Sequence, residues 1–388
     1  MSLPSRTESH FLQKQARGQL QVRTAAAFRS LVQEAGLAEA YALTDVVVAA
    51  DAGFTDQASL HLSLGATDPP IRLRDAQLAG INASTGHGSS DLVLPIGGGL
   101  GGTAPRGGAQ VLASLLQGDT IPLAAIGEAT ALHPRADLHT ELNLERIAGG
   151  RLVLHRGISE NGVVAVSSGE GLSPSPYGPL LGPYANALYT CGGAGSIGLT
   201  MPALSLLGPG SPVLVGGAIG WVIGAGSGHQ PQVKRQASGH ATSPGCCAAV
   251  SVDLHALQPQ WVRACFFEGH GSALMVAMAA AVPLIDGVTA QQASLGDDEL
   301  QAPVLDLSIP RRLKPSLGQA SYGELLSGQL QLPGPQPHRS LRCAPAHSPQ
   351  LATSLAAELV TQLESGTFPL RLPLRPLSNR PSLVPLEA

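Results

Sequence analysis

The chain has 388 residues, of which 44% are hydrophobic and only 13% charged, and its formal net charge is −4. This is enough apolar material for a substantial core, and the absence of a basic stretch interleaved with aromatic residues excludes a typical nucleic-acid-binding surface. The N-terminal stretch MSLPSRTESH lacks the apolar core of a signal peptide, and prolines and glycines interrupt the longest apolar run, at 199–226. We therefore expect a cytoplasmic protein with no membrane span.

Helices and strands alternate in the first third of the chain. A helix is expected at 9–16 and a strand at 20–24, followed by a second helix that Thr24 caps and Gly36 ends. The continuous apolar run at 46–50 predicts a strand buried on both faces. The segment 70–84 predicts a pair of partly exposed strands, and a glycine-rich loop then leads into a helix at 108–116.

Strand-like blocks dominate the middle of the chain. Single strands flanked by turns are expected in the blocks 120–130, 140–147, 151–158, 162–169, 211–226, 246–254 and 273–285, and a short helix in 289–300. The pattern predicts an α/β or α+β fold in residues 1–310, with a mixed, strand-rich sheet, buried strands and long Gly/Pro loops.

The composition changes after about residue 310. Residues 330–350 are rich in proline and read as a linker, and leucines spaced by four at 351, 355, 359 and 363 predict an amphipathic helix. We therefore expect a second region at 311–388, consisting of a linker and a C-terminal helix, that is separable from the main domain.

The five cysteines form no CxxC motif and no paired spacing. This pattern argues against a disulfide framework, a zinc site or an iron–sulfur cluster held within the chain, and it favours a reducing compartment. No cofactor is expected within the chain.

The uncharged segment 177–195 contains three of the five tyrosines and one cysteine. Tyrosine hydroxyls can orient a carbonyl or carboxylate, and glycines let the backbone approach a ligand closely, so the segment is a candidate pocket wall. The alternative is that the tyrosines pack an ordered loop onto the core and that Cys191 is a small buried apolar residue.

Four blocks, in order, resemble the homocysteine-biosynthesis family of sulfur-incorporation enzymes. They are LGATDPPIRL (64–73), RGGAQVLASLLQG (106–118), YGPLLGPYANALYT (177–190) and VLVGGAIGWVIGAGSGHQ (213–230). The resemblance extends over about residues 20–305, without the C-terminal tail. It implies transfer of sulfur to an aspartate-semialdehyde-like carbonyl, giving homocysteine or a related thiol, with an external reductant or a separate ferredoxin-like, iron–sulfur partner.

The resemblance also implies a pair of cysteines, which this chain lacks. Their positions correspond to about Asp56 and Leu132. Three hypotheses stay open: a sulfurtransferase with altered residues, a non-catalytic homologue that binds a small metabolite and regulates or scaffolds a partner, and an enzyme that uses Asp56 for acid–base chemistry.

The candidate site follows from these blocks and from the residue types that they contain. As catalytic residues we expect Cys191 as the thiol, His229 as an acid or base, and Asp56. Asp68 suits a turn before two prolines, although its carboxylate can also bind an amine. As substrate-binding residues we expect Asp68, His87, Arg106, Tyr177, Tyr184, Asn186, Tyr189, Gly217 and Gly220.

Overall fold

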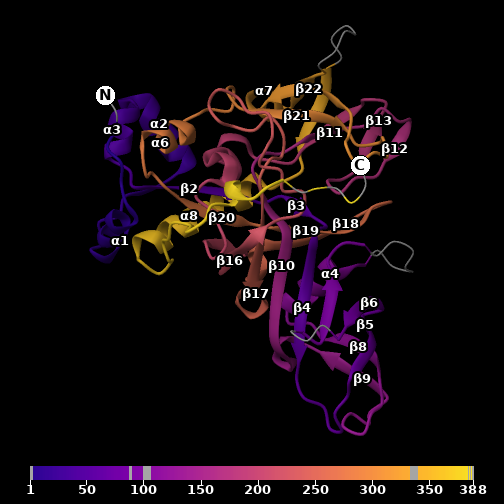
Figure 1. Cartoon of the computed structure of the whole chain (residues 1–388). Helices are drawn as coiled ribbons and strands as arrows, with labels where there is room; N and C mark the ends of the chain where they lie inside the picture. The colour runs from indigo at the N-terminus through magenta and orange to yellow at the C-terminus, as the bar shows by residue number, and fades with distance from the viewer. Residues whose placement is uncertain are drawn as a thin grey trace.

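The computed structural model describes residues 3–86, 90–98, 106–332, 340–382, 384 and 386. In this part of the chain, the strands form one large sheet and three smaller ones, with helices gathered mainly on one side (Figure 1). The predicted class, mixed α and β with a large strand-rich sheet, is confirmed. Most neighbouring strands are antiparallel, which makes the fold α+β.

The large sheet contains thirteen strands from the described residues. In spatial order they are β1 (Val22–Thr24), β2 (Val46–Asp51), β20 (Met278–Pro283), β15 (Pro212–Val215), β16 (Ala218–Ala225), β17 (Cys247–Asp253), β10 (Ile147–Ser159), β4 (Ala58–Leu64), β7 (Leu92–Pro95), β6 (Ile81–Thr85), β5 (Leu73–Leu78), β8 (Ile121–Gly127) and β9 (Asp137–Leu142). β10, with 13 residues, pairs with both β17 and β4. These long strands lead into an arm made by β5, β6, β8 and β9 (Figure 1).

Strand β2 is buried on both faces, as its continuous apolar sequence predicts. Val47 and Ala49 belong to the main hydrophobic core, whereas Val46, Val48 and Ala50 belong to a second core on the other face of the sheet. The side chains of a strand alternate between faces, so two covered faces require an uninterrupted apolar run.

A second sheet contains six strands from the described residues. In spatial order they are β22 (Ser316–Ser321), β21 (Gln301–Asp306), β11 (Val164–Val166), β14 (Asn186–Tyr189), β24 (Ser340–Pro345) and β23 (Gln329–Gln331). The smaller groups are the pair β12 (Gly171–Ser173) and β13 (Leu180–Gly182), and the sheet of β18 (Val262–Phe267), β19 (Gly271–Val276) and β3 (Phe54–Thr55).

The helices follow the local sequence signals closely. They are α1 (Glu8–Ala16), α2 (Ala25–Ala35), α3 (Leu37–Ala42), α4 (Gly108–Leu116), α5 (Ile197–Thr200), α6 (Gly287–Ala293), α7 (Tyr322–Leu326) and α8 (Pro349–Glu364). The Thr24 side chain accepts a hydrogen bond from the Ala27 N–H, and Gly36, with φ 82°, ends α2. The predicted cap and stop are therefore confirmed. No helix in the described ranges is both long and apolar enough to cross a lipid bilayer.

Two blocks that were each predicted as one strand contain two. Residues 211–226 form the hairpin of β15 and β16, which turns at Gly216 and Gly217 with φ 56° and 82°. Two successive positive φ values suit a tight two-residue hairpin turn, and glycine adopts them without strain. Residues 273–285 are divided at Ala277 between β19 and β20, which lie in different sheets. An apolar run does not reveal which of two sheets each half joins.

The tail also differs from the sequence interpretation. The predicted linker contains β24, which pairs in parallel with β14 and antiparallel with β23, so residues 340–345 are not a linker. β21 and β22, on either side of residue 310, pair with each other. The predicted helix is confirmed as α8, and it packs on β1, β2 and β20 with Leu355, Leu359 and Leu363 fully buried. Parallel pairing between strands distant in sequence leaves no local signal, which is why the proline-rich composition was misleading.

Candidate functional site

A cavity of about 170 Å³ lies where the ends of β2 and β10 meet the segment 176–191. Side chains with chemical functions line it, among them Asp51, Asp56, Arg156, Tyr177 and Cys191. A larger hollow, of about 670 Å³, lies on the arm between β5, β8 and β9. We assign the site to the smaller cavity, because it collects an acid with a shifted pKa, a thiol and a guanidinium, a combination typical of functional sites.

Asp51 is the last residue of β2, and it lines the cavity. The backbone N–H of Ile197 donates a hydrogen bond to Asp51 Oδ2 at 3.0 Å. Burial raises the pKa of Asp51 to about 6, against the smaller opposing effect of this hydrogen bond. A carboxyl with such a pKa exists in both protonation states near neutral pH, as an acid–base catalyst requires. Sequence reasoning missed this residue, although an acid that directly ends a buried strand is a readable signal.

Cys191 is 8% exposed and lines the cavity together with Asp51. Burial, and next the Asp51 charge, raise the pKa of Cys191 to about 11. Its thiol is therefore protonated at neutral pH, whereas a thiolate nucleophile needs a pKa shifted in the opposite direction. Nearby, the Tyr322 hydroxyl donates to Asn161 Oδ1 at 2.6 Å, which fixes Asn161 at the cavity wall.

Asp56 and Tyr177 lie in the same cavity. His270 Nε2 is 3.1 Å from Asp56 Oδ2, so the Asp56 carboxylate already has a partner. Burial raises the pKa of the Tyr177 phenol, and the nearby Arg156 guanidinium lowers it in part. The structure thus brings together three of the residues predicted from the sequence: Asp56, Tyr177 and Cys191.

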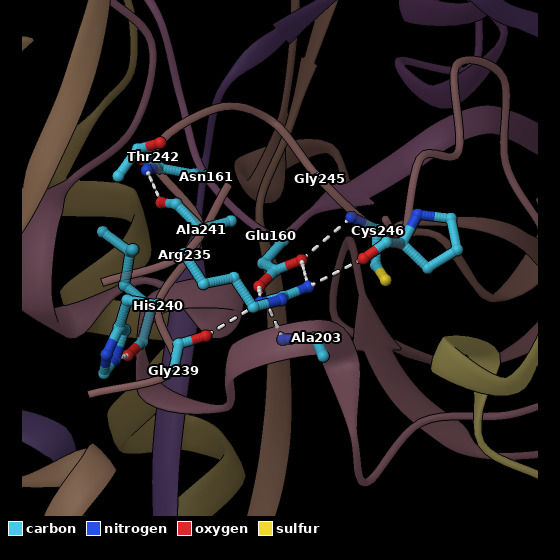
Figure 2. A network of polar contacts seen from close by, with 12 residues as sticks. Glu160, Asn161, Ala203, Arg235, Gly239, His240, Ala241, Thr242, Gly245 and Cys246 are labelled. Carbon is cyan, nitrogen blue, oxygen red and sulfur yellow. Dashed lines mark hydrogen bonds and ion pairs between the residues drawn. The ribbon is translucent and has the colours of Figure 1, made fainter. Parts of the chain in front are cut away.

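A buried ion pair fixes the rim of the cavity. The Glu160 side chain is fully buried, accepts backbone N–H groups from Ala203 at 2.7 Å and Cys246 at 2.9 Å, and pairs with the Arg235 guanidinium (Figure 2). Next to it, the Asn161 side chain donates to the carbonyls of Ala241 and Gln301, both at 2.7 Å. These contacts hold the segment 231–245, whose Pro244 lines the cavity.

Several predicted residues serve the fold elsewhere. His229 is buried with Nδ1 at 3.1 Å from the Cys247 backbone, and burial lowers its pKa. Gly217 occupies the hairpin turn, and Gly220 lies within β16 against Val215. None of the three lines the cavity.

The remaining tyrosines and Asn186 shape the segment around the cavity rather than its lining. Asn186 accepts the Leu181 N–H at 2.7 Å and donates to the Pro179 carbonyl at 3.2 Å. Tyr184 packs against the core of the six-stranded sheet, and Tyr189 is buried in that core.

Three predicted positions are placed outside the cavity or cannot be placed. Asp68 is exposed in the loop after β4, and Arg106 is exposed before α4. His87 lies outside the described residues. Leu132, where the family resemblance implies a cysteine, is 79% exposed on the arm. All five cysteines are free, and within the described ranges no group of three His, Cys, Asp or Glu side chains could hold a metal ion.

Comparison with known proteins gives a consistent result. A family model described as "Homocysteine biosynthesis enzyme, sulfur-incorporation" matches residues 20–370. The match confirms the resemblance seen in the sequence and corrects its extent, because it continues past residue 305 through β22–β24 and α8. The tail contributes strands and a packed helix, which explains why it belongs to the family region.

Two curated relatives match over most of this chain. L-aspartate semialdehyde sulfurtransferase of Methanocaldococcus jannaschii is 26% identical over 376 residues, covering 92% of this chain and 70% of the relative. The protein of the same name from Methanosarcina acetivorans is 27% identical over 373 residues, covering 94% of this chain and 70% of the relative. No solved structure matches the chain.

Proposed function

We propose that this chain, which belongs to the homocysteine biosynthesis family of sulfur-incorporation enzymes, is a sulfurtransferase acting on a short amino-acid aldehyde of the aspartate-semialdehyde type. The product is homocysteine or a related thiol. Two curated relatives named L-aspartate semialdehyde sulfurtransferase support this substrate class. The observation that carries the proposal is the cavity that Asp51, with a pKa of about 6, lines together with Cys191.

The reaction balances in two steps. One hydrogen sulfide adds to the aldehyde carbon and one water leaves, which gives a thiocarbonyl. Two electrons and two protons then reduce the thiocarbonyl to the thiol. The sulfur donor and the reductant are separate reactants, and we propose a ferredoxin-like iron–sulfur protein as the electron source. The five free cysteines suit a reducing compartment, so we place the reaction in the cytoplasm.

Asp51 has the properties of the proton-transfer group. As the carbon–sulfur bond forms, its carboxylate takes the S–H proton and passes a proton to the carbonyl oxygen, which leaves as water after a second protonation. A group that is poised between its two protonation states near neutral pH transfers protons in both directions.

Cys191 suits thiolate chemistry less well than Asp51 suits acid–base chemistry. The raised pKa keeps its sulfur protonated, and position 56, where the resemblance implies a cysteine, holds an aspartate. We therefore assign Cys191 to the cavity wall, in contact with the substrate, rather than to a persulfide carrier.

The test is complementation of a strain that cannot make homocysteine, with the protein alone and with candidate electron donors. Asp51→Asn should lower the rate of thiol formation by about 10²- to 10⁴-fold, the range for loss of an acid–base group. Cys191→Ser should retain activity, because serine is close to cysteine in size and its protonated hydroxyl replaces a thiol that is itself protonated. Asp68→Asn, an exposed acid on the arm, is the matched control and should grow like the wild type.

Other outcomes point elsewhere. Loss of growth in Cys191→Ser with normal growth in Asp51→Asn would assign the chemistry to a persulfide on Cys191. Failure of the wild-type chain with every donor would favour the alternative, a homologue that binds a metabolite without transforming it.

A further inference from the structure

Arg156 lies at an irregularity in β10 that turns its side chain toward the cavity. The pairing of β10 with β17 shifts register between Leu154 and Ile158, and the pairing with β4 ends at Leu154. A Cβ on Gly157 would lie only 3.1 Å from the Val250 side chain and 3.2 Å from Leu154 Cβ, so a residue without a side chain fits here best. Bulges of this kind redirect a side chain and are common beside active sites.

The Arg156 guanidinium is partly buried and lacks an acidic partner. Its Nε donates to Ser159 Oγ at 3.1 Å, and this is the one hydrogen bond that its side chain makes to a described residue. Across the described residues, no carboxylate lies within 4.0 Å of it, whereas the comparably enclosed Arg235 is paired with Glu160. Of the two acids that line the cavity, Asp56 is engaged by His270, and Asp51 accepts the Ile197 N–H.

A partly buried guanidinium without a counterion favours an anionic ligand. Removing a charge from water without a partner is unfavourable, and the planar fork of arginine matches a carboxylate with two parallel hydrogen bonds. Ser159 fixes Nε and thereby leaves the two terminal nitrogens for the ligand. The volume of about 170 Å³ restricts that ligand to a small molecule.

We infer that Arg156 binds the carboxylate of a small amino-acid ligand and so places the far end of that ligand toward Asp51 and Cys191. The identity of the ligand as an aldehyde rests on the proposed function, whereas recognition of its carboxylate rests on the guanidinium and the cavity alone. Arg156 therefore determines which short-chain compounds enter the site.

Calorimetric binding tests this assignment without any sulfur donor or reductant. The probe is L-homoserine, the alcohol analogue of the aldehyde, and its partner probe is 3-aminopropan-1-ol, which lacks the carboxylate. Wild type should bind L-homoserine, and Arg156→Gln should weaken that binding about 10- to 100-fold, the usual effect of losing a charge-assisted pair. Both proteins should bind 3-aminopropan-1-ol equally weakly.

Two further variants control for folding and charge. Arg151→Gln removes an exposed arginine from the same strand and should leave binding unchanged. Arg156→Lys keeps the positive charge but loses the two parallel hydrogen bonds of the guanidinium, so it should retain part of the affinity for L-homoserine. If Arg156→Gln does not fold, Arg156→Lys replaces it in this test. Unchanged homoserine binding in a folded Arg156 variant, or no homoserine binding by wild type, overturns the inference. Carboxylate-dependent binding without any thiol formation by wild type would instead refute only the proposed reaction.

Discussion

The two ends of strand β4 carry similar residue types in opposite environments. Asp56, just before the strand, lines the cavity with Asp51 and Cys191. Asp68, just beyond the other end, is exposed, and the ion pair between Arg72 and Glu128 near it is more than half exposed on both sides. Seven extended residues separate the ends by about 23 Å. Burial, rather than residue type, therefore distinguishes the candidate site from the surface.

The GATDPP motif lies at the exposed end, on the arm. Ile71 forms an isolated bridge with Arg135, and the Arg135 N–H donates to the Pro70 carbonyl at 3.4 Å. The larger hollow is bordered by this loop, together with His133 and Arg146. The motif thus shapes the end of the arm, and the sequence alone did not separate this role from a role at the cavity.

The largest expected difference is in packing, between the buried helix α8 and the exposed arm. Leu359→Ala, in the helix that covers β2, should lower the free energy of unfolding by about 2–5 kcal/mol, because it leaves a cavity beneath a fully buried side chain. Leu132→Ala on the arm, where the side chain is 79% exposed, should change it by less than about 0.5 kcal/mol. Urea unfolding measures both. A loss below about 1 kcal/mol in Leu359→Ala would instead support a separable tail.

Thiol reactivity should also differ between the ends. Burial raises the pKa of Cys191 to about 11, so only a small fraction of the Cys191 side chains is thiolate at neutral pH. A cysteine introduced by Leu132→Cys should react with iodoacetamide at least about 100-fold faster than Cys191, as expected from an ordinary thiol pKa. Peptide mass spectrometry at timed intervals gives both rates. Rapid labelling of Cys191 would revive its role as a nucleophile.

The smallest expected effect is a dependence of stability on pH. Asp51 has its pKa raised from 3.8 to about 6 in the folded state, so the folded protein binds its proton more tightly than the unfolded chain. The destabilisation caused by ionised Asp51 is therefore absent below pH 3.8 and complete above about pH 6. We therefore expect the difference in unfolding free energy between Asp51→Asn and the wild type to grow in favour of the variant by about 1 kcal/mol from pH 5 to pH 8, as measured by urea unfolding at the two pH values.

Asp68→Asn is the control for this pH dependence, since its carboxyl is exposed at the opposite end of β4. The same urea titrations at the two pH values should show no comparable change. Equal pH dependence in both variants would mean that Asp51 is not desolvated by the cavity.

The sequence alone determined the ends of helix α2, the buried faces of β2 and α8, and the family. Capping residues such as Thr24 and glycines such as Gly36 mark where helix α2 begins and ends. The sequence reveals them because each acts only on the few residues next to it. The apolar run of β2 and the leucine spacing of α8 likewise predicted burial correctly. The quoted blocks were enough to identify the family over most of its length.

Only the tertiary structure decided which residues line the same cavity. Asp51, Arg156 and Cys191 come from separate segments, and the cavity exists because β2 and β10 end beside the segment that holds Cys191. The pairing of β24 was likewise decided only by the tertiary structure, because its partner β14 lies far away in the sequence. Burial, the pKa shifts that follow from it and pairing between distant strands depend on neighbours that the chain acquires only by folding.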